Sequence, residues 1–349
     1  MEPRTAERWR AREGSSTLDS SDTGRSWPGI RHVLVPLDGS QLAECVLPFA
    51  AVVAQAFAAR VTLLRVLEAH RGPAVSPRVD PLLWEISQGA ARNELSRIAG
   101  EFEPALTTPS VEIVAGAAAE QIIHFAEEQH VDLIVLSSHG EGGLSGWLLS
   151  STVQKVVRRA STSVLIVPAY ARSGQRIGDL RLARILLALD CSPRAECILP
   201  LARALARLHD GELILAHVVP EPELPRRLSP SAGDLALAAQ LIERNRAEAE
   251  RYLAELESQV AAQGTRVRVR IVASPRRDRA LRELADKENV DLLLLCAHGK
   301  TGEAGERHGT VAARLMQSSN RPMLIVQDLA DIPCAVNPAQ EAAREHPGH

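Results

Sequence analysis

The sequence VDLIVLSSHG at residues 131–140 returns in the second half of the chain as VDLLLLCAHG at residues 290–299. Four more segments recur in the same order. They pair HVLVPLDGS (32–40) with RILLALDCS (184–192), AECVLPFA (43–50) with AECILPLA (195–202), VEIVAG (111–116) with VRIVAS (269–274), and SVLIVP (163–168) with PMLIVQ (322–327). Because five matched segments in one order do not arise by chance, the sequence predicts two copies of one domain.

Each copy alternates short apolar runs with longer stretches of helical periodicity. Near-continuous runs of Val, Leu and Ile are typical of strands that are buried on both faces of a parallel sheet. In the first copy these runs are residues 33–37, 61–67, 111–114, 133–136 and 164–167. The alternation predicts an α/β fold made of two tandem copies of a doubly wound, five-stranded parallel-sheet domain.

The first helix of each copy carries a start signal and a proline. Ser40 and Ser192 are good N-cap residues, and Pro193 sits at the preferred first helical position. Pro48 and Pro200 fall within the helical pattern, so we expect them to kink these helices or to delay their regular start.

Composition excludes several classes of protein. The length of 349 residues suits two domains better than one. Lys and Arg total 40 against 43 for Asp and Glu, a formal charge of −3, so no dominant basic face for nucleic acid is expected. No apolar stretch is long enough to span a membrane, and the N-terminus lacks the apolar core of a signal peptide. We therefore expect a cytoplasmic protein with neither a membrane nor a nucleic-acid partner.

Changes of composition suggest where the domains begin and end. We expect a disordered N-terminal segment at residues 1–29, a first domain at 30–169, a linker at 170–181, a second domain at 182–328 and a loose tail at 329–349. The five cysteines include no C-x-x-C pair, which argues against a disulfide framework or a structural zinc site.

Ligands of open α/β sheets bind beyond the carboxyl ends of the strands, where the strand order reverses. Asp38 and Asp190 follow the first strand of each copy, where a carboxylate could accept hydrogen bonds from a ribose or could simply favour a helix start. The fourth strand of each copy is followed by a loop rich in small residues, which returns to a helix near Ser151 or Thr310. Backbone amides at such a helix start form an anion site.

These segments resemble the universal stress protein family, in its tandem two-domain form, over roughly residues 30–328. Nucleotide-binding members carry Gly, two residues, Gly, nine residues, and then Gly followed by Ser or Thr. The second copy matches this motif at Gly299, Gly309 and Thr310, with Cys296 in place of the first glycine.

The first copy of the motif departs further from the pattern. It keeps Gly140 and the hydroxyl residue Ser151, while Ser137 and Ser150 replace two of the three glycines. Because serine has a Cβ and reaches positive φ at a cost, we expect a narrower first phosphate loop.

The resemblance implies a HUP-like, Rossmann-like fold and a stress-response regulatory protein that binds ATP, with or without Mg²⁺. Asp38 and Asp190 would contact the nucleoside, and Val66 and Val218 would offer backbone contacts to adenine. The phosphates would rest on residues 140–151 and 299–310. No nucleophile–base pair is evident in the sequence, so any ATP hydrolysis would be slow and incidental.

An alternative from the same family is an interaction scaffold without nucleotide. The resemblance implies that the fifth strands, at residues 164–167 and 323–326, pair across a domain interface, here as a pseudo-dimer within one chain. Whether two chains then form a homodimer, and which client protein is involved, stays open. His139 and His298 precede the loop glycines, where we expect hydrogen bonding within the loop rather than catalysis. Cys296 lines the expected phosphate loop, where redox sensitivity is conceivable.

Overall fold

The computed structural model describes residues 29–68, 81–102, 108–139, 149–169, 175–192, 195–222, 231–299 and 308–327. Several sequence predictions therefore lie outside the described residues. They concern the N-terminal segment before Gly29, Gly140 and most of both glycine-rich loops, Pro193, the first part of the linker and the C-terminal tail.

The first half of the chain alternates strands and helices, as the sequence predicts. Its elements are β1 (His32–Pro36), α1 (Gln41–Glu44), α2 (Leu47–Phe57), β2 (Arg60–Leu67), α3 (Pro81–Glu101), β3 (Ser110–Ala115), α4 (Ala118–Glu128), β4 (Leu133–Ser137), α5 (Ser151–Arg159) and β5 (Ser163–Val167).

The second half repeats this order. Its elements are β6 (Arg184–Ala188), a 3₁₀ helix η1 (Ala195–Ile198), α6 (Leu199–Leu208), β7 (Glu212–Pro220), α7 (Ala232–Ala262), β8 (Arg266–Ser274), α8 (Arg277–Lys287), β9 (Leu292–Cys296), α9 (Thr310–Ser318) and β10 (Met323–Val326). With 31 residues against 21, α7 is longer than its counterpart α3.

All ten strands form one sheet in the order β3-β2-β1-β4-β5-β10-β9-β6-β7-β8. Pairing is parallel within each half and antiparallel only between β5 and β10. In each half the strand order reverses once, between β1 and β4 or between β6 and β9. The prediction of two doubly wound, five-stranded domains is confirmed.

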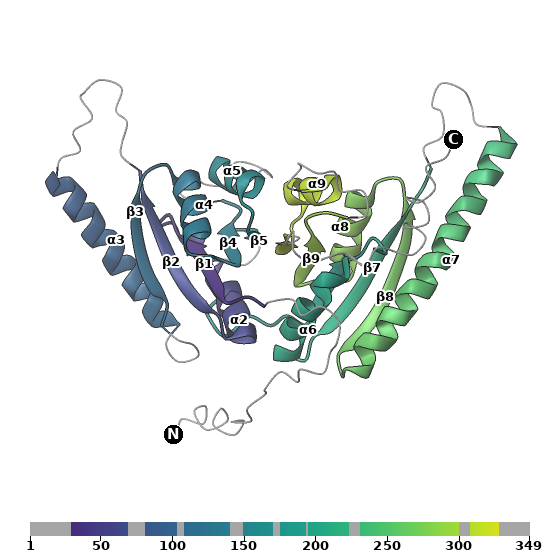
Figure 1. Ribbon diagram of the computed structural model, residues 1–349, viewed down its shortest axis with the longest axis horizontal. Helices are drawn as coiled ribbons and strands as arrows, with labels where there is room; N and C mark the ends of the chain where they lie inside the picture. The colour runs from purple at the N-terminus through teal and green to yellow at the C-terminus, as the bar shows by residue number, and fades with distance from the viewer. Residues whose placement is uncertain are drawn as a thin grey trace, which may run out of the picture.

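The seam between the halves is the β5–β10 pair. Its register places Ile166 opposite Met323, Leu165 opposite Leu324 and Val164 opposite Ile325. Figure 1 shows the two halves on either side of this seam, with α3 and α7 at the outer ends. The fifth strands are therefore not open edges, because each covers the other within one chain.

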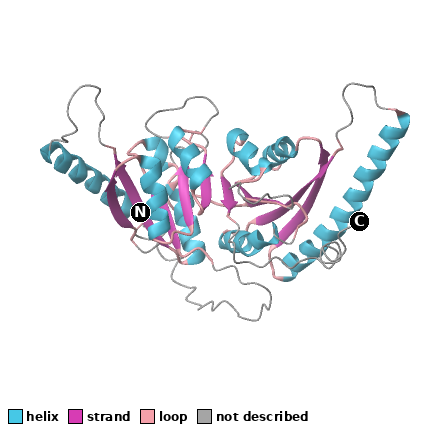
Figure 2. Cartoon of the chain, turned by 45° about the horizontal axis from the view of Figure 1, so that its top comes forward, coloured by secondary structure: helices cyan, strands magenta, loops and turns pink. Residues whose placement is uncertain are grey.

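Helices cover both faces of the sheet, as Figure 2 shows. On one face, α2, α3, α6 and α7 close a core whose largest members include Phe49 and Phe102. On the other face, α4, α5, α8 and α9 close a second core, which includes Val156 and Leu315. Both cores contain residues of both halves, so each continues across the seam. None of the helices in the described part of the chain is long and apolar enough to cross a membrane.

The prolines delay the start of the first helices, one of the two outcomes expected from the sequence. Helix α2 begins at Leu47 and α6 at Leu199, so Pro48 and Pro200 lie in the first turn, where a missing N–H is tolerated. The Ser40 hydroxyl accepts a hydrogen bond from the Ala43 N–H, as an N-cap does, and Ser192 does the same for Ala195.

Candidate functional site

A cavity of about 410 Å³ lies in the second half at the carboxyl ends of β6 and β9, where the strand order reverses. Open α/β sheets bind their ligands at this position. The cavity brings together all five residues that the sequence predicts for a second nucleotide site: Asp190, Val218, Gly299, Gly309 and Thr310.

Asp190 and Gly299 approach each other across this cavity. The Asp190 carboxylate is held by the N–H and the hydroxyl of Ser192, with its Oδ1 at 3.1 Å and 2.6 Å respectively. A Cβ atom added at Gly299 would lie only 2.5 Å from Asp190 Oδ2. A side chain at this position would therefore have to displace the Asp190 carboxylate. The strand-end carboxylate directly faces the beginning of the loop after β9.

The start of α9 forms another part of the wall. Gly309 is the N-cap residue of α9, and its N–H donates to the Ala297 carbonyl at 2.7 Å. Its φ is −66°, which any residue adopts. At the corresponding place in the first half, Ser150 has a φ of −58°, and its hydroxyl accepts from the Val153 N–H to cap α5. Serine at this position therefore costs no backbone strain, because the backbone here does not need positive φ. Whether the first loop is narrower stays a prediction, because residues 140–148 lie outside the described residues.

Helix α7 supplies a wall that the sequence did not indicate. Asn245 and Glu248 of α7 line the cavity. One turn further on, the Tyr252 hydroxyl donates to Glu196 at 2.7 Å and thereby ties α7 to η1. Burial, followed by the hydrogen bond with Glu196, raises the pKa of Tyr252 far above its usual range, so this hydroxyl stays protonated.

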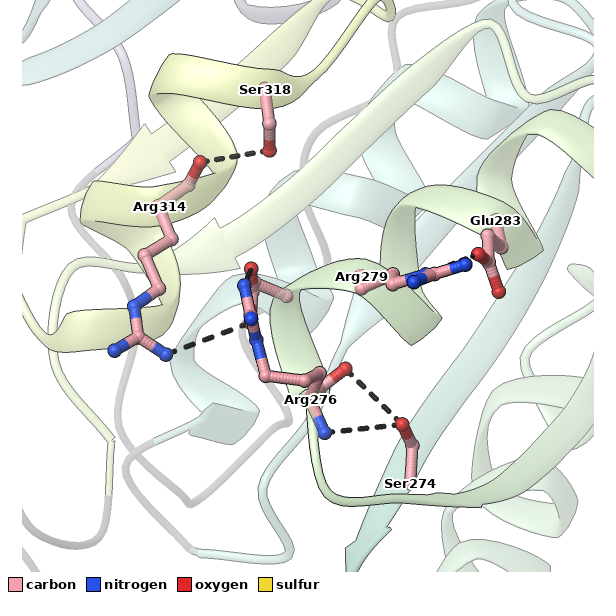
Figure 3. A network of polar contacts seen from close by, with 7 residues as sticks. Ser274, Arg276, Arg279, Glu283, Arg314 and Ser318 are labelled. Atoms are coloured by element: carbon pink, nitrogen blue, oxygen red, sulfur yellow. Dashed lines mark hydrogen bonds and ion pairs between the residues drawn. The ribbon is translucent and has the colours of Figure 1, made fainter.

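Helix α8 closes another side, and Arg277 in its first turn lines the cavity. The next residue, Asp278, is buried and ties α8 to α9: Arg276 lies 3.3 Å and Arg314 3.8 Å from its carboxylate. Figure 3 shows these arginines where the two helices meet. Burial raises the pKa of Asp278, but the hydrogen bond and charge of Arg276, with Arg314, outweigh it and hold the pKa below its ordinary value.

His217 and Cys191 also line the cavity, and sequence reasoning missed both. His217 Nδ1 lies 2.8 Å from the Leu189 carbonyl, which can accept only from a protonated nitrogen. The Cys191 Sγ is 3.4 Å from the same nitrogen. Burial lowers the pKa of His217, against the opposing effect of the Leu189 hydrogen bond, so the ring favours its neutral form. The signal available in the sequence was position, since Cys191 follows Asp190 and His217 precedes Val218.

In the first half, the described site residues lie in corresponding places. Asp38 accepts from the N–H and the hydroxyl of Ser40 at 3.0 Å and 2.7 Å, as Asp190 does from Ser192. Val66 is partly buried on β2, and Ser150 and Ser151 begin α5. The loop that would complete this site, from Gly140, lies outside the described residues.

Arg65 is one side chain by which the first site differs from the second. Arg65 occupies the place on β2 that His217 has on β7, and its guanidinium packs against Gly39. Its Nη1 also donates to the Leu37 carbonyl at 3.4 Å. The larger side chain therefore covers the turn that carries Asp38.

Of the histidines before the loop glycines, His139 is buried, whereas His298 is partly exposed and lines the cavity of the second half. His139 is 3% exposed, and its Nδ1 lies 2.9 Å from the Ser138 hydroxyl. That hydroxyl in turn accepts from the Ala169 N–H at 3.1 Å. These Ser138 contacts tie the end of β4 to the end of β5, while His139 Nε2 is buried without a hydrogen-bond partner among the described residues. Hydrogen bonding of His139 within the loop stays a prediction, because the loop from Gly140 lies outside the described residues.

A model of the universal stress protein family matches residues 29–168 and again residues 182–327. The chain belongs to this family, with two of its domains in tandem. A universal stress protein of Mycobacterium tuberculosis is 27% identical over 220 residues, which are 62% of this chain and 68% of the relative. One of Methanocaldococcus jannaschii is 28% identical over 144 residues, which are 39% of this chain and 81% of the relative.

Solved structures show the same fold. The crystal structure of a universal stress protein from Archaeoglobus fulgidus has a TM-score of 0.59 at 20% identity and covers 86% of this chain and 97% of its own. A Pseudomonas aeruginosa protein described as functionally unknown has a TM-score of 0.59 at 18% identity, covering 91% and 98%.

Proposed function

We propose that this protein is a stress-response regulator that binds an adenine nucleotide, which we expect to be ATP, in the cavity of its second domain. The observation that carries the proposal is the shared cavity of about 410 Å³, which Asp190, Gly299 and Thr310 line together with Val218 and Gly309. This volume lies within the ~300–1,000 Å³ range of small-molecule sites.

Each wall suits a different part of such a ligand. The Asp190 carboxylate can accept hydrogen bonds from ribose hydroxyls, and the backbone of Val218 can meet the edge of the adenine. The N-terminus of α9, with Thr310 as its first residue, offers N–H groups and a hydroxyl to phosphate. The first turn of α9 has no acidic residue, and Arg277 adds a positive charge to the cavity wall.

Magnesium would enter this site with the phosphates. Mg²⁺ usually keeps several waters and binds through substrate phosphates and one or two protein oxygens. Among the residues that the structure describes, no group of three or more His, Cys, Asp or Glu side chains is placed to hold a metal. The side-chain oxygen of Thr310 would be the protein's contribution at the phosphate end.

The cavity is built for binding rather than for catalysis. Among the described residues that line it, Cys191 and His217 place a thiol next to an imidazole. The Leu189 carbonyl engages the His217 nitrogen that faces the sulfur, so this nitrogen carries a proton and cannot accept one from the thiol. Burial also lowers the pKa of His217, which disfavours the imidazolium that would stabilise a thiolate. We therefore expect at most slow, incidental hydrolysis.

The first domain would hold a second site that binds the nucleotide more weakly. Its residues would be Asp38, Val66, Gly140, Ser150 and Ser151. Arg65 lies against Gly39, the residue next to Asp38, which we expect to contact the nucleoside. We therefore expect ATP to fill the second domain first.

Calorimetric titration with ATP and Mg²⁺ tests this proposal. We expect Asp190→Ala and Gly309→Val each to weaken binding at least about tenfold, or ~1.4 kcal/mol. Gly309→Val is informative because a Cβ there meets its nearest neighbour, the Ala297 carbonyl, at an ordinary 3.5 Å. The added Cβ therefore fits, while the γ-carbons of valine crowd the phosphate end. Asp38→Ala is the matched control and should leave the tighter site unchanged.

Undiminished affinity in both second-domain variants would refute the assignment of this cavity. If the wild-type protein does not bind ATP at all and carries no copurified adenine nucleotide in native mass spectrometry, the family's alternative role as an interaction scaffold is supported instead.

A further inference from the structure

Two cysteine side chains meet at the wall of the cavity. The Sγ atoms of Cys197 and Cys296 are 3.4 Å apart, although the residues are far apart in the sequence. Cys197 lies on η1 and is partly exposed, while Cys296 is the last residue of β9, is 8% exposed and lines the cavity. Both cysteines are present as thiols in the structure. A disulfide requires its sulfurs about 2.05 Å apart, so the two sulfurs must move closer by about 1.3 Å.

The first domain has the same contact with different chemistry. There, Cys45 takes the place of Cys197 and Ser137 the place of Cys296, and the Cys45 Sγ lies 3.5 Å from the Ser137 hydroxyl oxygen. The two domains thus hold the same kind of pair at the same place, but only the second pair can be oxidised to a disulfide. Burial raises the pKa of Cys45 to about 11, which makes this thiol poorly reactive.

We propose that Cys197 and Cys296 are a redox modification site that peroxide converts into a disulfide. The partly exposed Cys197 reacts first: its thiolate attacks hydrogen peroxide, forms a sulfenic acid and releases hydroxide. The Cys296 thiol then attacks this sulfur, and water leaves. In total, two thiols and one peroxide give one disulfide and two waters, with the sulfurs oxidised and the peroxide reduced. A dithiol reductant reverses the reaction by exchange.

The disulfide would join two walls of the cavity. Helix η1 packs against β9 and follows the turn that carries Asp190. Strand β9 leads directly to Gly299, which faces the Asp190 carboxylate. Drawing η1 toward β9 should therefore narrow the cavity and weaken ATP binding several-fold. This second effect rests on the proposed nucleotide site, whereas the cross-link itself does not.

Peptide mapping tests the cross-link on the full chain. Tryptic cleavage after Arg194 separates Cys191 from Cys197, which falls on peptide 195–203, while Cys296 falls on peptide 288–300. After treatment with a small excess of peroxide and blocking of the remaining thiols, we expect these two peptides to be joined. The joined peptide should disappear when dithiothreitol is added before blocking, and Cys45 should stay a blocked thiol.

Three variants distinguish this pair from general thiol oxidation. Cys296→Ser recreates the Cys–Ser pair of the first domain, so it should fold and should lose the joined peptide. Cys191→Ser and Cys334→Ser should keep it. A wild-type protein in which Cys197 and Cys296 remain separate, or are oxidised no faster than Cys45, would overturn the proposal.

A failure of the proposed disulfide and a failure of its effect on ATP binding can be told apart. ATP titration of the fully cross-linked protein, with Cys296→Ser as the unlinkable control, measures the effect on the cavity. An unchanged ATP affinity beside a complete cross-link would overturn only the coupling. An absent cross-link beside normal ATP binding would overturn the redox site and leave the proposed function intact.

Discussion

Gly39 and Cys191 occupy the same place in the two domains, each directly after the aspartate that follows the first strand. Both have positive φ, 84° and 59° respectively. An added Cβ at Gly39 would lie 2.5 Å from Nη1 of Arg65, so glycine leaves room for the guanidinium. In the second domain, the smaller His217 side chain stands opposite Cys191, and the position accommodates a Cβ.

The close approach of Arg65 to Gly39 makes a stability prediction. We expect Gly39→Ala to lower the free energy of unfolding by about 1–2 kcal/mol from its left-handed backbone alone, and further through the clash with Arg65. In an Arg65→Ala background the clash disappears, so the loss should be smaller. Urea unfolding of the double-mutant cycle measures the difference.

Gly89→Ala serves as the control for this cycle. Gly89 lies within α3 and an added Cβ there meets nothing within 4 Å, so alanine should stabilise by about 0.5–1 kcal/mol. If Gly39→Ala lowers the free energy of unfolding equally with and without the Arg65 side chain, the clash does not contribute to the loss.

At this scale the sequence predicts only part of the candidate site. Asp190 and Gly299 could be placed near each other because the carboxyl ends of neighbouring parallel strands meet at one edge of a sheet. Cys191 and His217 adjoin predicted residues, but no pattern marks them. Glu248 could not be foreseen, because its place depends on how α7 packs, which the Tyr252–Glu196 hydrogen bond helps to fix.

Among the elements, the β5–β10 pair joins the halves through buried apolar side chains. Leu324 of β10 is fully buried and lies opposite Leu165, itself 1% exposed. We expect Leu324→Ala to lower the free energy of unfolding by about 2–5 kcal/mol, because the cavity it leaves sits in the core that crosses the seam. Chemical denaturation followed by circular dichroism provides the measurement.

Leu237→Ala is the matched change on a surface. This leucine of α7 is 67% exposed, so its loss should alter the free energy of unfolding by no more than about 0.5 kcal/mol. Equal effects of the two substitutions would show that the seam does not carry the stability assigned to it.

The sequence predicts the presence and order of the helices and strands better than it predicts the lengths of the helices. Apolar runs predict the strands to within one or two residues, since buried parallel strands have little freedom of composition. The ten additional residues of α7 compared with α3 leave only a trace, as a shift in the spacing of the repeats. For Pro48 the sequence leaves open whether the helix is kinked or starts late, because proline fixes the local backbone without fixing where the helix begins. The structure shows the late start, with α2 beginning at Leu47.

At the scale of the whole molecule, one buried and two partly buried histidines make stability depend on pH. Burial lowers the pKa of His32, His209 and His217 below the ordinary 6.5. Below pH 6.5 the unfolded chain therefore binds more protons at these residues than the folded chain does. The free energy of unfolding should be highest above this pH and fall as the solution is acidified through the lowered values.

Urea unfolding at a series of pH values checks this dependence. His32→Gln keeps a polar side chain beside Thr62 and should give a shallower slope below pH 6.5, whatever its effect at higher pH. If the free energy of unfolding falls with pH as steeply in this variant as in the wild-type protein, His32 does not contribute to the pH dependence.

The sequence predicts the doubling of the molecule directly, because the repeated segments are explicit. It does not reveal that each core continues across the seam, since that depends on contacts between residues of different copies such as those of α2 and α6.

Joining the halves through β5 and β10 within one polypeptide has an evolutionary consequence. In a symmetric dimer of separate chains, every substitution is imposed on both subunits at once, and a change that helps one site must be tolerated by the other. Here each half can acquire its own residues independently, and the two are always made in equal number. Arg65 against His217, and Ser137 against Cys296, are differences that a single chain permits and that two identical subunits could not show.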